Sequence, residues 1–386
     1  MSSELMDHWL QTNKYACIGG LMLKPTEHQL MPGTVLSIQR GQAEAFCMAA
    51  DDGSHWIIKK FHRGRGLDVA YLRQVSQLLP HHPALQPGTD RRILGKQDLQ
   101  QKRGFHHSAQ LASWLEATVL MPRAHGVDWA SLADDLRDGT VSLQPSQRLA
   151  ICRATQEVVL LLEAHQLAHR DLSCGNLFID PNTWQVILID YDSMFHVSLS
   201  MPPGTTCGTA GYAARFAWKG GQADATATWC EGADRFSAAI LCTEFLVMGP
   251  NTPMASEGGM FTQEELCKGD GPAVQLASTA LARSFPQILP VFQATLAARS
   301  FRDCPSPEDW LPGLGGRGTK PVFPPPPLDN LENPLPEQFE EILRKRRKVA
   351  QIWPAPALSD LPTFDSVLPQ RKTWPIHFVP LPARAW

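Results

Sequence analysis

Two aspartates and an asparagine, placed around a predicted β-hairpin, constrain this chain more than any other feature of its sequence. Asp171 and Asn176 precede the apolar run 177–179, and Asp190 follows a second apolar run. An Asp-Pro-Asn turn separates the two runs, and turn residues between β-branched and aromatic runs predict a hairpin. The hairpin would bring Asn176, before its first strand, beside Asp190, at the end of its second.

These side chains suit the transfer of a phosphoryl group. An amide oxygen and a carboxylate that meet at one point can hold a Mg²⁺ ion shared with phosphate oxygens. Asp171 lies on the preceding loop and could accept a proton from an attacking hydroxyl. We therefore expect a phosphate-handling site at the open end of the hairpin.

Both motifs resemble those of the protein kinase family. The loop His169-Arg-Asp-Leu-Ser-Cys-Gly-Asn176 is similar to the catalytic loop H-R-D-L-x-x-x-N, and Asp190-Tyr-Asp192 is similar to the magnesium motif D-F-G. The resemblance spans residues 33–311. It implies an α+β, bilobal protein kinase-like fold, with a small antiparallel β-sheet as the N-lobe and a mainly helical C-lobe.

The resemblance also implies cofactors and roles for individual residues. ATP and Mg²⁺ would bind, with Asp171 deprotonating the substrate hydroxyl and Asn176 and Asp190 holding the metal. The strand sequence Trp-Ile-Ile-Lys resembles V-A-I-K, whose lysine holds the nucleotide phosphates, and this gives Lys59 that role. Because side chains alternate along a strand, Lys60 should face away from the site.

The predicted nucleotide-binding segments depart from the family in two places. The turn over the phosphates holds one glycine, Gly41, where the family has a G-x-G-x-x-G run, and fewer glycines leave fewer backbone N–H groups for phosphate. The helix predicted at 67–79 lacks the Glu that pairs with the strand lysine. Arg73 and Gln74 lie nearest that position, so we expect Lys59 to be unpaired and less well positioned.

A strand predicted at 117–123 leads into the segment whose backbone receives adenine in the family, here Leu120, Met121 and Arg123. Its Leu-Met-Pro-Arg sequence, together with Asp-Tyr-Asp-Ser, is similar to a bacterial subgroup of kinase-like proteins with an L-M-P-basic hinge and a D-x-D-S magnesium motif. Asp192 replaces the glycine of the magnesium motif, and it either caps the turn or adds a metal ligand.

The predicted C-lobe supports the catalytic loop. Residues 148–165 have a mostly apolar helical pattern, which indicates a helix buried on most sides. A second helix at 231–246 carries Asp234, which the resemblance places against the backbone of the loop. His169 is expected to brace the loop by hydrogen bonds, and Arg170 could pair with a phosphate on the segment that follows the magnesium motif.

These observations predict a serine/threonine protein kinase of bacterial type, which transfers a phosphoryl group from ATP to a protein substrate. The alternative is a pseudokinase scaffold that binds nucleotide and protein partners with little or no transfer, and Ser173 favours it because a lysine is usual there. A small-molecule kinase of the aminoglycoside phosphotransferase kind shares the Asp–Asn–Asp arrangement. Segment 207–212, similar to the G-T-x-G-Y segment that seats protein acceptors, argues against that reading.

The composition argues against several other classes of protein. A net charge of −3 offers no broad basic surface for nucleic acid. The sequence holds no apolar run long enough to predict a membrane span. The nine cysteines include no C-x-x-C pair, so we expect reduced thiols, no zinc and a cytoplasmic location.

The chain divides into four predicted parts. They are an N-terminal extension at 1–32, the N-lobe at 33–124, the C-lobe at 125–311 and a Pro-rich C-terminal tail at 312–386. The tail holds 15 of the 32 prolines, and such a sequence cannot sustain long helices or central strands. We expect one short helix in the tail, which could bind a protein partner.

Overall fold

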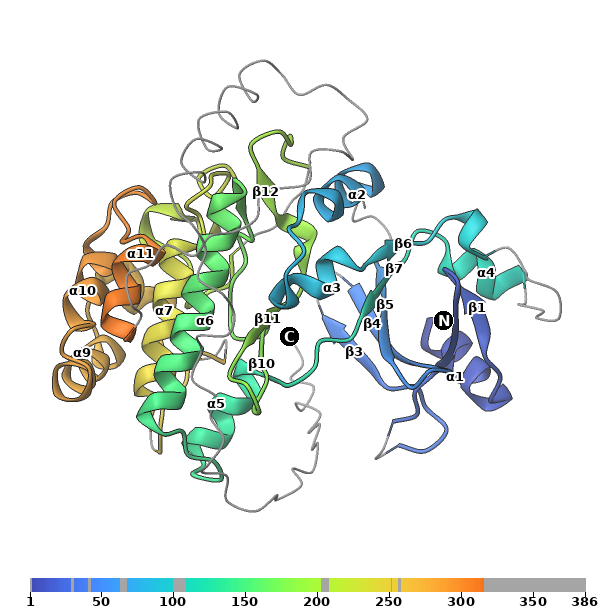
Figure 1. The fold of residues 1–386 in the computed structure, drawn as a ribbon, viewed down its shortest axis with the longest axis horizontal. Helices are drawn as coiled ribbons and strands as arrows, with labels where there is room; N and C mark the ends of the chain where they lie inside the picture. The colour runs from blue at the N-terminus through green and yellow to red at the C-terminus, as the bar shows by residue number, and fades with distance from the viewer. Residues whose placement is uncertain are drawn as a thin grey trace, which may run out of the picture. The chain divides into compact units, whose positions relative to one another are not determined.

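The computed structural model describes residues 2–28, 31–40, 43–62, 68–99, 109–202, 208–250, 252–255 and 258–315. These residues form an α+β fold, which confirms the predicted class, with one large antiparallel sheet and a mainly helical remainder (Figure 1). Gly41 and the chain from residue 316 onward, which includes most of the predicted Pro-rich tail, lie outside the described residues.

Among the described residues, seven strands form one antiparallel sheet in the order β1-β2-β4-β5-β7-β6, with β3 paired to β4 outside that path. The strands are β1 (Ala16–Ile18), β2 (Leu21–Pro25), β3 (Ser37–Arg40), β4 (Ala43–Ala50), β5 (His55–Phe61), β6 (Arg92–Ile93) and β7 (Val119–Pro122). The antiparallel sheet predicted over 34–61 is confirmed. It also includes β1 and β2, which the sequence had suggested were part of an N-terminal extension.

The sheet shares an apolar core with helices α1 (Ser2–Thr12) and α4 (Ala109–Leu115). Met6 and Trp9 of α1 are buried in it, and Phe46 of β4 meets the ring of Trp114 edge to face, with centroids 5.4 Å apart. Each fully buried large apolar side chain contributes roughly 1.5–3 kcal/mol. Helix α1 is therefore part of the packing of the sheet rather than an appendage.

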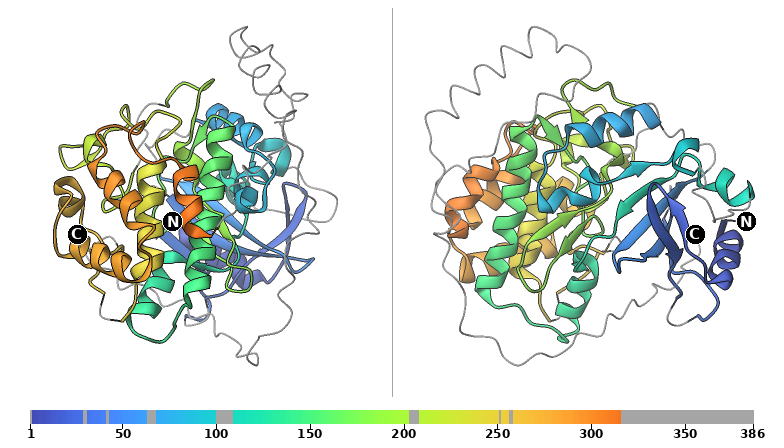
Figure 2. Two further views of the ribbon diagram at one scale, coloured as in Figure 1. Left: turned by 60° about the vertical axis from the view of Figure 1, so that its left-hand side comes forward. Right: turned by 45° about the vertical axis from the view of Figure 1, so that its right-hand side comes forward.

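The remaining described chain is mainly helical. Its helices are α2 (Val69–Leu78), α3 (Gln86–Thr89), α5 (Trp129–Arg137), α6 (Pro145–Ala164), α7 (Arg235–Val247), α8 (Gln263–Lys268), α9 (Pro272–Ser284), α10 (Leu289–Ala297) and α11 (Pro307–Trp310), with 3₁₀ turns at Pro83–Leu85, Lys96–Leu99, Tyr191–Ser193, Arg215–Ala217 and Leu311–Leu314. Helices α6 and α7 lie side by side (Figures 1 and 2). Residues 236–246 of α7 are all buried, which places this helix at the centre of the second core.

The predicted hairpin is present. Strands β10 (Leu177–Ile179) and β11 (Val186–Leu188) pair antiparallel, β8 (Val127–Asp128) pairs with the other edge of β10, and β11 packs against α6. Gly126, just before β8, has a φ of +92°, and a Cβ atom there would lie 2.2 Å from the carbonyl oxygen of Ile179. Only glycine fits at this position. Shorter pairs join β9 (Leu167–Ala168) to β12 (Phe195–His196) and β13 (Trp218–Lys219) to β14 (Gln222–Ala223).

Two predictions from composition concern the membrane and the cysteines. Within the part of the chain that the structure describes, no helix combines the length and apolarity needed to cross a bilayer. Eight of the nine cysteines lie in that part, and all eight are free thiols, as expected from their unpatterned spacing.

A buried carboxylate joins three segments of the helical part. Glu244 of α7 accepts hydrogen bonds from the Trp129 indole N–H, the Tyr212 hydroxyl and the backbone N–H of Met260, at 2.9, 2.9 and 2.6 Å. The side chain is fully buried, and this burial raises the pKa of Glu244 to about 7, although the three hydrogen bonds oppose the rise. Glu244 thus links the segment that contains Tyr212 to the centre of the helical core.

The raised pKa of Glu244 should make the stability of the folded protein depend on pH. Because the pKa of Glu244 in the folded protein lies above its ordinary value of 4.5, the folded chain keeps a proton that the unfolded chain loses between those two pH values. The Glu244 contribution to stability is therefore complete at low pH and falls as pH rises, by about 3 kcal/mol in total. We expect urea unfolding of Glu244→Gln to lose this component, so that the difference in stability between the wild type and the variant shrinks from pH 5 to pH 8. A constant difference would contradict the assignment.

Candidate functional site

A single buried carboxylate holds the loop that carries Asp171. Asp234, at the start of α7, accepts hydrogen bonds from the backbone N–H groups of His169 and Arg170, at 2.6 and 2.7 Å. His169 Nε2 donates to the carbonyl oxygen of Ile189 at 2.8 Å. The contacts predicted for Asp234 and His169 are therefore confirmed. The two hydrogen bonds to Asp234 hold Arg170 in a left-handed conformation, with φ at +69°, which non-glycine residues adopt at a cost of about 1–3 kcal/mol.

Both oxygens of the Asp171 carboxylate are hydrogen-bonded. The side-chain amide of Asn176 donates to Oδ2 at 3.2 Å and to the backbone oxygen of Asp171 at 2.8 Å, and Thr209 Oγ1 donates to Oδ1 at 2.9 Å. The backbone N–H of Ile189, next to Asp190, donates to the carbonyl of Asn176 at 3.0 Å. The hairpin therefore brings the segments of Asn176 and Asp190 together as predicted. Thr209 was not among the predicted site residues, although its Gly-Thr-Ala-Gly-Tyr segment had been noted.

The environment of Asp171 prepares it to accept a proton. Burial raises its pKa to about 6, helped by the negative charge of Asp190 and opposed by His169 and the hydrogen bonds from Thr209 and Asn176. A base is most effective when its pKa lies near the working pH while it is still largely ionised. Asp171 meets both conditions at neutral pH.

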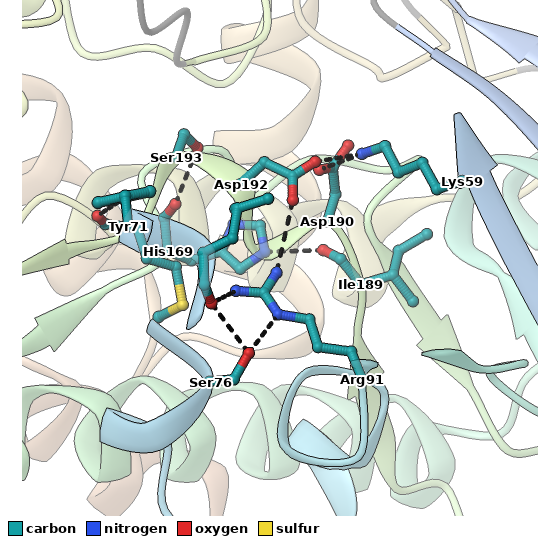
Figure 3. A network of polar contacts seen from close by, with 11 residues as sticks. Lys59, Tyr71, Ser76, Arg91, His169, Ile189, Asp190, Asp192 and Ser193 are labelled. Atoms are coloured by element: carbon teal, nitrogen blue, oxygen red, sulfur yellow. Dashed lines mark hydrogen bonds and ion pairs between the residues drawn. The ribbon is translucent and has the colours of Figure 1, made fainter. Parts of the chain in front are cut away.

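The two strand lysines point to opposite sides of the sheet, as predicted. Lys59 Nζ lies 2.8 Å from Asp190 Oδ1 and 2.5 Å from Asp192 Oδ2 (Figure 3). Lys60 Nζ instead donates to the backbone oxygens of Trp114 and Glu116, at 2.6 and 3.2 Å. The expectation that Lys59 would be unpaired is wrong, because its carboxylate partners come from the end of the hairpin and not from the preceding helix.

Helix α2 supplies no carboxylate to the site. Arg73 and Gln74, the positions nearest the expected one, are exposed to solvent. The guanidinium of Arg91 lies against α2 instead, donating to Ser76 Oγ at 2.7 Å and to the Leu72 carbonyl at 2.9 Å. Its third nitrogen lies 3.5 Å from Asp192 Oδ1.

The charges at this cluster shift the pKa values of both carboxylates. Burial tends to raise the pKa of Asp190, but the charge of Lys59 and the hydrogen bonds with Asp192 and Lys59 outweigh burial and lower it. Burial raises the pKa of Asp192, with a further rise from Asp190, against the opposing charges of Lys59 and Arg91. Burial disfavours the Lys59 ammonium, yet Asp192 and Asp190 together raise its pKa. Lys59 therefore stays charged at neutral pH.

The predicted adenine-binding strand is β7. Leu120 is fully buried in the core under the sheet, and the N–H of Arg123 donates to the carbonyl of His55 at 3.0 Å. Hydrogen bonding alternates along an antiparallel pair, so the carbonyl of Pro122 points away from β5. Pro122, which lies within the predicted segment 120–123, offers an outward-facing acceptor.

Asn176 and Asp190 fit a magnesium ion that shares its coordination with phosphate. The Asn176 amide nitrogen is committed to Asp171, which leaves its Oδ1 as the ligand atom. The Asp190 side chain is 37% exposed. Within the described residues, no three His, Cys, Asp or Glu side chains gather as a metal cage. Mg²⁺ commonly binds one or two protein oxygens and completes its coordination with phosphate oxygens and water, and one amide oxygen with one carboxylate would supply the protein part.

Arg170, for which we expected a phosphate partner on the segment after the magnesium motif, binds backbone oxygens within the described residues, and Thr205 and Thr206 of that segment lie outside them. Its guanidinium is 3% exposed and donates to the carbonyl oxygens of Ser193, Ala225 and Thr228, at 2.6, 2.8 and 3.0 Å. It also stacks on the ring of Trp229, 4.6 Å from the centroid. The structure thus uses this charge to join loops. Sequence alone does not distinguish such a buried role from an exposed one.

Comparison with known proteins leaves the chain unassigned to a family. Neither a scan of the sequence against protein-family models nor a search of curated proteins finds a match. The functional argument therefore depends on the geometry of the cluster around Asp171 and Lys59.

Proposed function

We propose that this chain is an ATP- and Mg²⁺-dependent serine/threonine protein kinase with a bilobal protein kinase-like fold. One observation carries the proposal: Lys59 of the sheet bonds to Asp190 at the end of the hairpin, while Asn176 at the start of the hairpin bonds to Asp171. A cation for phosphate, a pair of metal ligands and a proton acceptor thus come from separate parts of the chain to one place. These are the groups that phosphoryl transfer requires.

In this proposal each residue has a defined task. Lys59 binds the phosphates of ATP, and Asn176 and Asp190 hold Mg²⁺, which neutralises phosphate charge when bound. Asp171 accepts the proton of the attacking hydroxyl, and the bonds from Thr209 and Asn176 fix the direction of its carboxylate. Correct orientation of a base and its acceptor accounts for a large part of the rate in such reactions.

A protein hydroxyl is the acceptor that the neighbouring segment supports. Thr209, bonded to Asp171, begins a stretch that is anchored at several points. Gln263 accepts from the N–H of Gly211 at 2.9 Å and donates to the carbonyl of Ala213 at 2.8 Å, and Tyr212 bonds to Glu244. A rigid segment beside the base suits an extended polypeptide. Residues 209–212 of this anchored stretch also belong to the segment that resembles the G-T-x-G-Y segment of protein kinases.

The scaffold alternative retains one specific argument. Ser173 is buried and supplies no positive charge beside the acceptor. Asp190 and Asp192 are both paired with Lys59. Titration calorimetry with Mg·ATP, followed by a turnover assay, separates the two functions. Binding without transfer would favour the scaffold, whereas binding with transfer that depends on Asp171 would favour the kinase.

Lys59 and Lys60 provide a matched pair of variants. We expect Lys59→Met to lower phosphate incorporation from labelled ATP into a generic protein acceptor by about 10²–10³-fold, because a positioned charge on the transferring phosphate is lost. Lys60→Met alters the same strand on its other side and should retain most activity. The assay is run on both variants at a temperature at which thermal unfolding shows each of them to be folded. Equal incorporation by the two variants would contradict the proposed role of Lys59.

A further inference from the structure

Arg91 occupies the place from which α2 would otherwise reach the site. It lies between α3 and β6, and its side chain is 1% exposed. Two of its nitrogens are taken by Ser76 and the Leu72 carbonyl of α2, and the third faces Asp192 (Figure 3). Tyr191 adds a ring contact, 5.9 Å from the guanidinium carbon. A buried guanidinium in this position needs an anion nearby.

The charged side chains here alternate in sign. Arg91 contacts Asp192, Asp192 contacts Lys59, and Lys59 contacts Asp190, at 3.5, 2.5 and 2.8 Å. Without Asp192, the buried Arg91 cation would lose the carboxylate that it faces, and Lys59 would keep only Asp190 of its two carboxylates. Asp192 is the one member of the series that touches both cations.

Asp190 and Asp192 therefore have different tasks. If Asp190 holds Mg²⁺, its oxygens are shared between the metal and Lys59, and its hold on the lysine weakens. The Asp192 carboxylate is directed toward Lys59 and Arg91. Its position suits an anion that keeps the lysine in place after the metal and nucleotide bind.

We infer that Asp192 is the residue that positions Lys59 for nucleotide binding, and that Arg91 positions Asp192. This arrangement replaces the helix carboxylate that the chain lacks, and it ties the lysine to α2 through Arg91, Ser76 and Leu72. The inference rests on the proposed kinase function for its effect on catalysis. Its effect on Lys59 itself is independent of that function.

The test begins with protein free of nucleotide. The rate at which an amine-reactive acylating reagent modifies Lys59 at pH 8 is measured by peptide mass spectrometry in the wild type and in Asp192→Asn, with Lys60 on the other side of the strand as the internal reference. We expect the variant to raise the rate at Lys59 by about tenfold or more, because an ion pair that holds the ammonium group is lost. Asp192→Glu, which keeps the charge, should restore most of the slow rate. An unchanged rate at Lys59 in Asp192→Asn would overturn the inference, whatever the protein catalyses.

Kinetics then distinguish a positioning residue from a metal ligand. For Asp192→Asn, we expect kcat/KM for ATP to fall about 100-fold, the effect of a misplaced binding group, while the Mg²⁺ concentration for half-maximal rate stays unchanged. A rise in that Mg²⁺ concentration with little change in kcat/KM for ATP would show that Asp192 ligates the metal and would overturn the inference. If the wild type shows no transfer but the modification of Lys59 depends on Asp192 as expected, only the kinase proposal fails.

Removing one charge can unfold the protein, because Arg91 would be left buried without its anion. The double variant Arg91→Met/Asp192→Asn removes both charges, and we expect it to be more stable in urea than Asp192→Asn alone. Such non-additivity is the mark of residues that act through each other. Additive losses of stability would show that Arg91 does not hold Asp192.

Discussion

Replacement of Asp171 by Asn is expected to lower the rate of phosphoryl transfer by about 10²–10⁴-fold, the usual contribution of a general base. Asn keeps the size of the side chain, and its amide can still bond to Asn176 and to the hydroxyl of Thr209. The local structure should therefore survive, and the loss should fall on kcat. The measurement is phosphate incorporation from labelled ATP under single-turnover conditions.

The pH dependence of the wild type supplies an independent test of Asp171. Because the ionised form accepts the proton and the pKa is about 6, the rate should rise roughly tenfold per pH unit below pH 6 and level off above it. In Asp171→Asn this rise should disappear. A matched control is Asp180→Asn, in the turn of the same hairpin, where the carboxylate bonds only to turn residues and His125. Equal activity in Asp171→Asn and Asp180→Asn would refute the assignment of the base.

The second large effect concerns Asp234. We expect Asp234→Ala to destabilise the protein by about 2–6 kcal/mol, since the buried N–H groups of His169 and Arg170 would each lose their acceptor at roughly 1–3 kcal/mol. That loss is a large fraction of the 5–15 kcal/mol that typically separates folded from unfolded chains. Urea unfolding followed by tryptophan fluorescence measures the change.

A control for Asp234 lies on the surface. Asp138, at the end of α5, is exposed, and Asp138→Ala should change stability by less than about 0.5 kcal/mol. The Asp234 variant should also lose transfer activity at temperatures where it remains folded, because the catalytic loop is no longer fixed. If Asp234→Ala proved as stable as Asp138→Ala, the hydrogen bonds from Asp234 would not be what holds the loop at His169 and Arg170.

Features set by neighbouring residues were predictable from the sequence. The hairpin followed from two apolar runs and a turn, and the opposite directions of Lys59 and Lys60 followed from the alternation of side chains along a strand. The position of Asp234 followed from resemblance, and its contacts agree. In each case a short stretch of sequence carried enough information to place the residue.

Contacts between distant segments were not predictable in the same way. Arg91 lies in a stretch that reads as a polar, basic loop, and nothing in its local pattern signals burial against α2. Asp192 could be assigned a partner only when β5 and the hairpin were brought together in space. The bonds from Arg170 to carbonyl oxygens were not predicted for the related reason that a guanidinium can bind carbonyl oxygens as readily as a phosphate.

Gly126 limits where the sheet and the hairpin can move relative to each other. The chain leaves β7 at Pro122 and reaches the backbone of Ile179 only four residues later, at a point with no room for any side chain. Along this connection, a rotation that carries Lys59 toward or away from Asp190 would have to change the backbone of residues 123–125. Stiffening that short connection, for example by proline, would restrict such a rotation without touching Lys59 or Asp190.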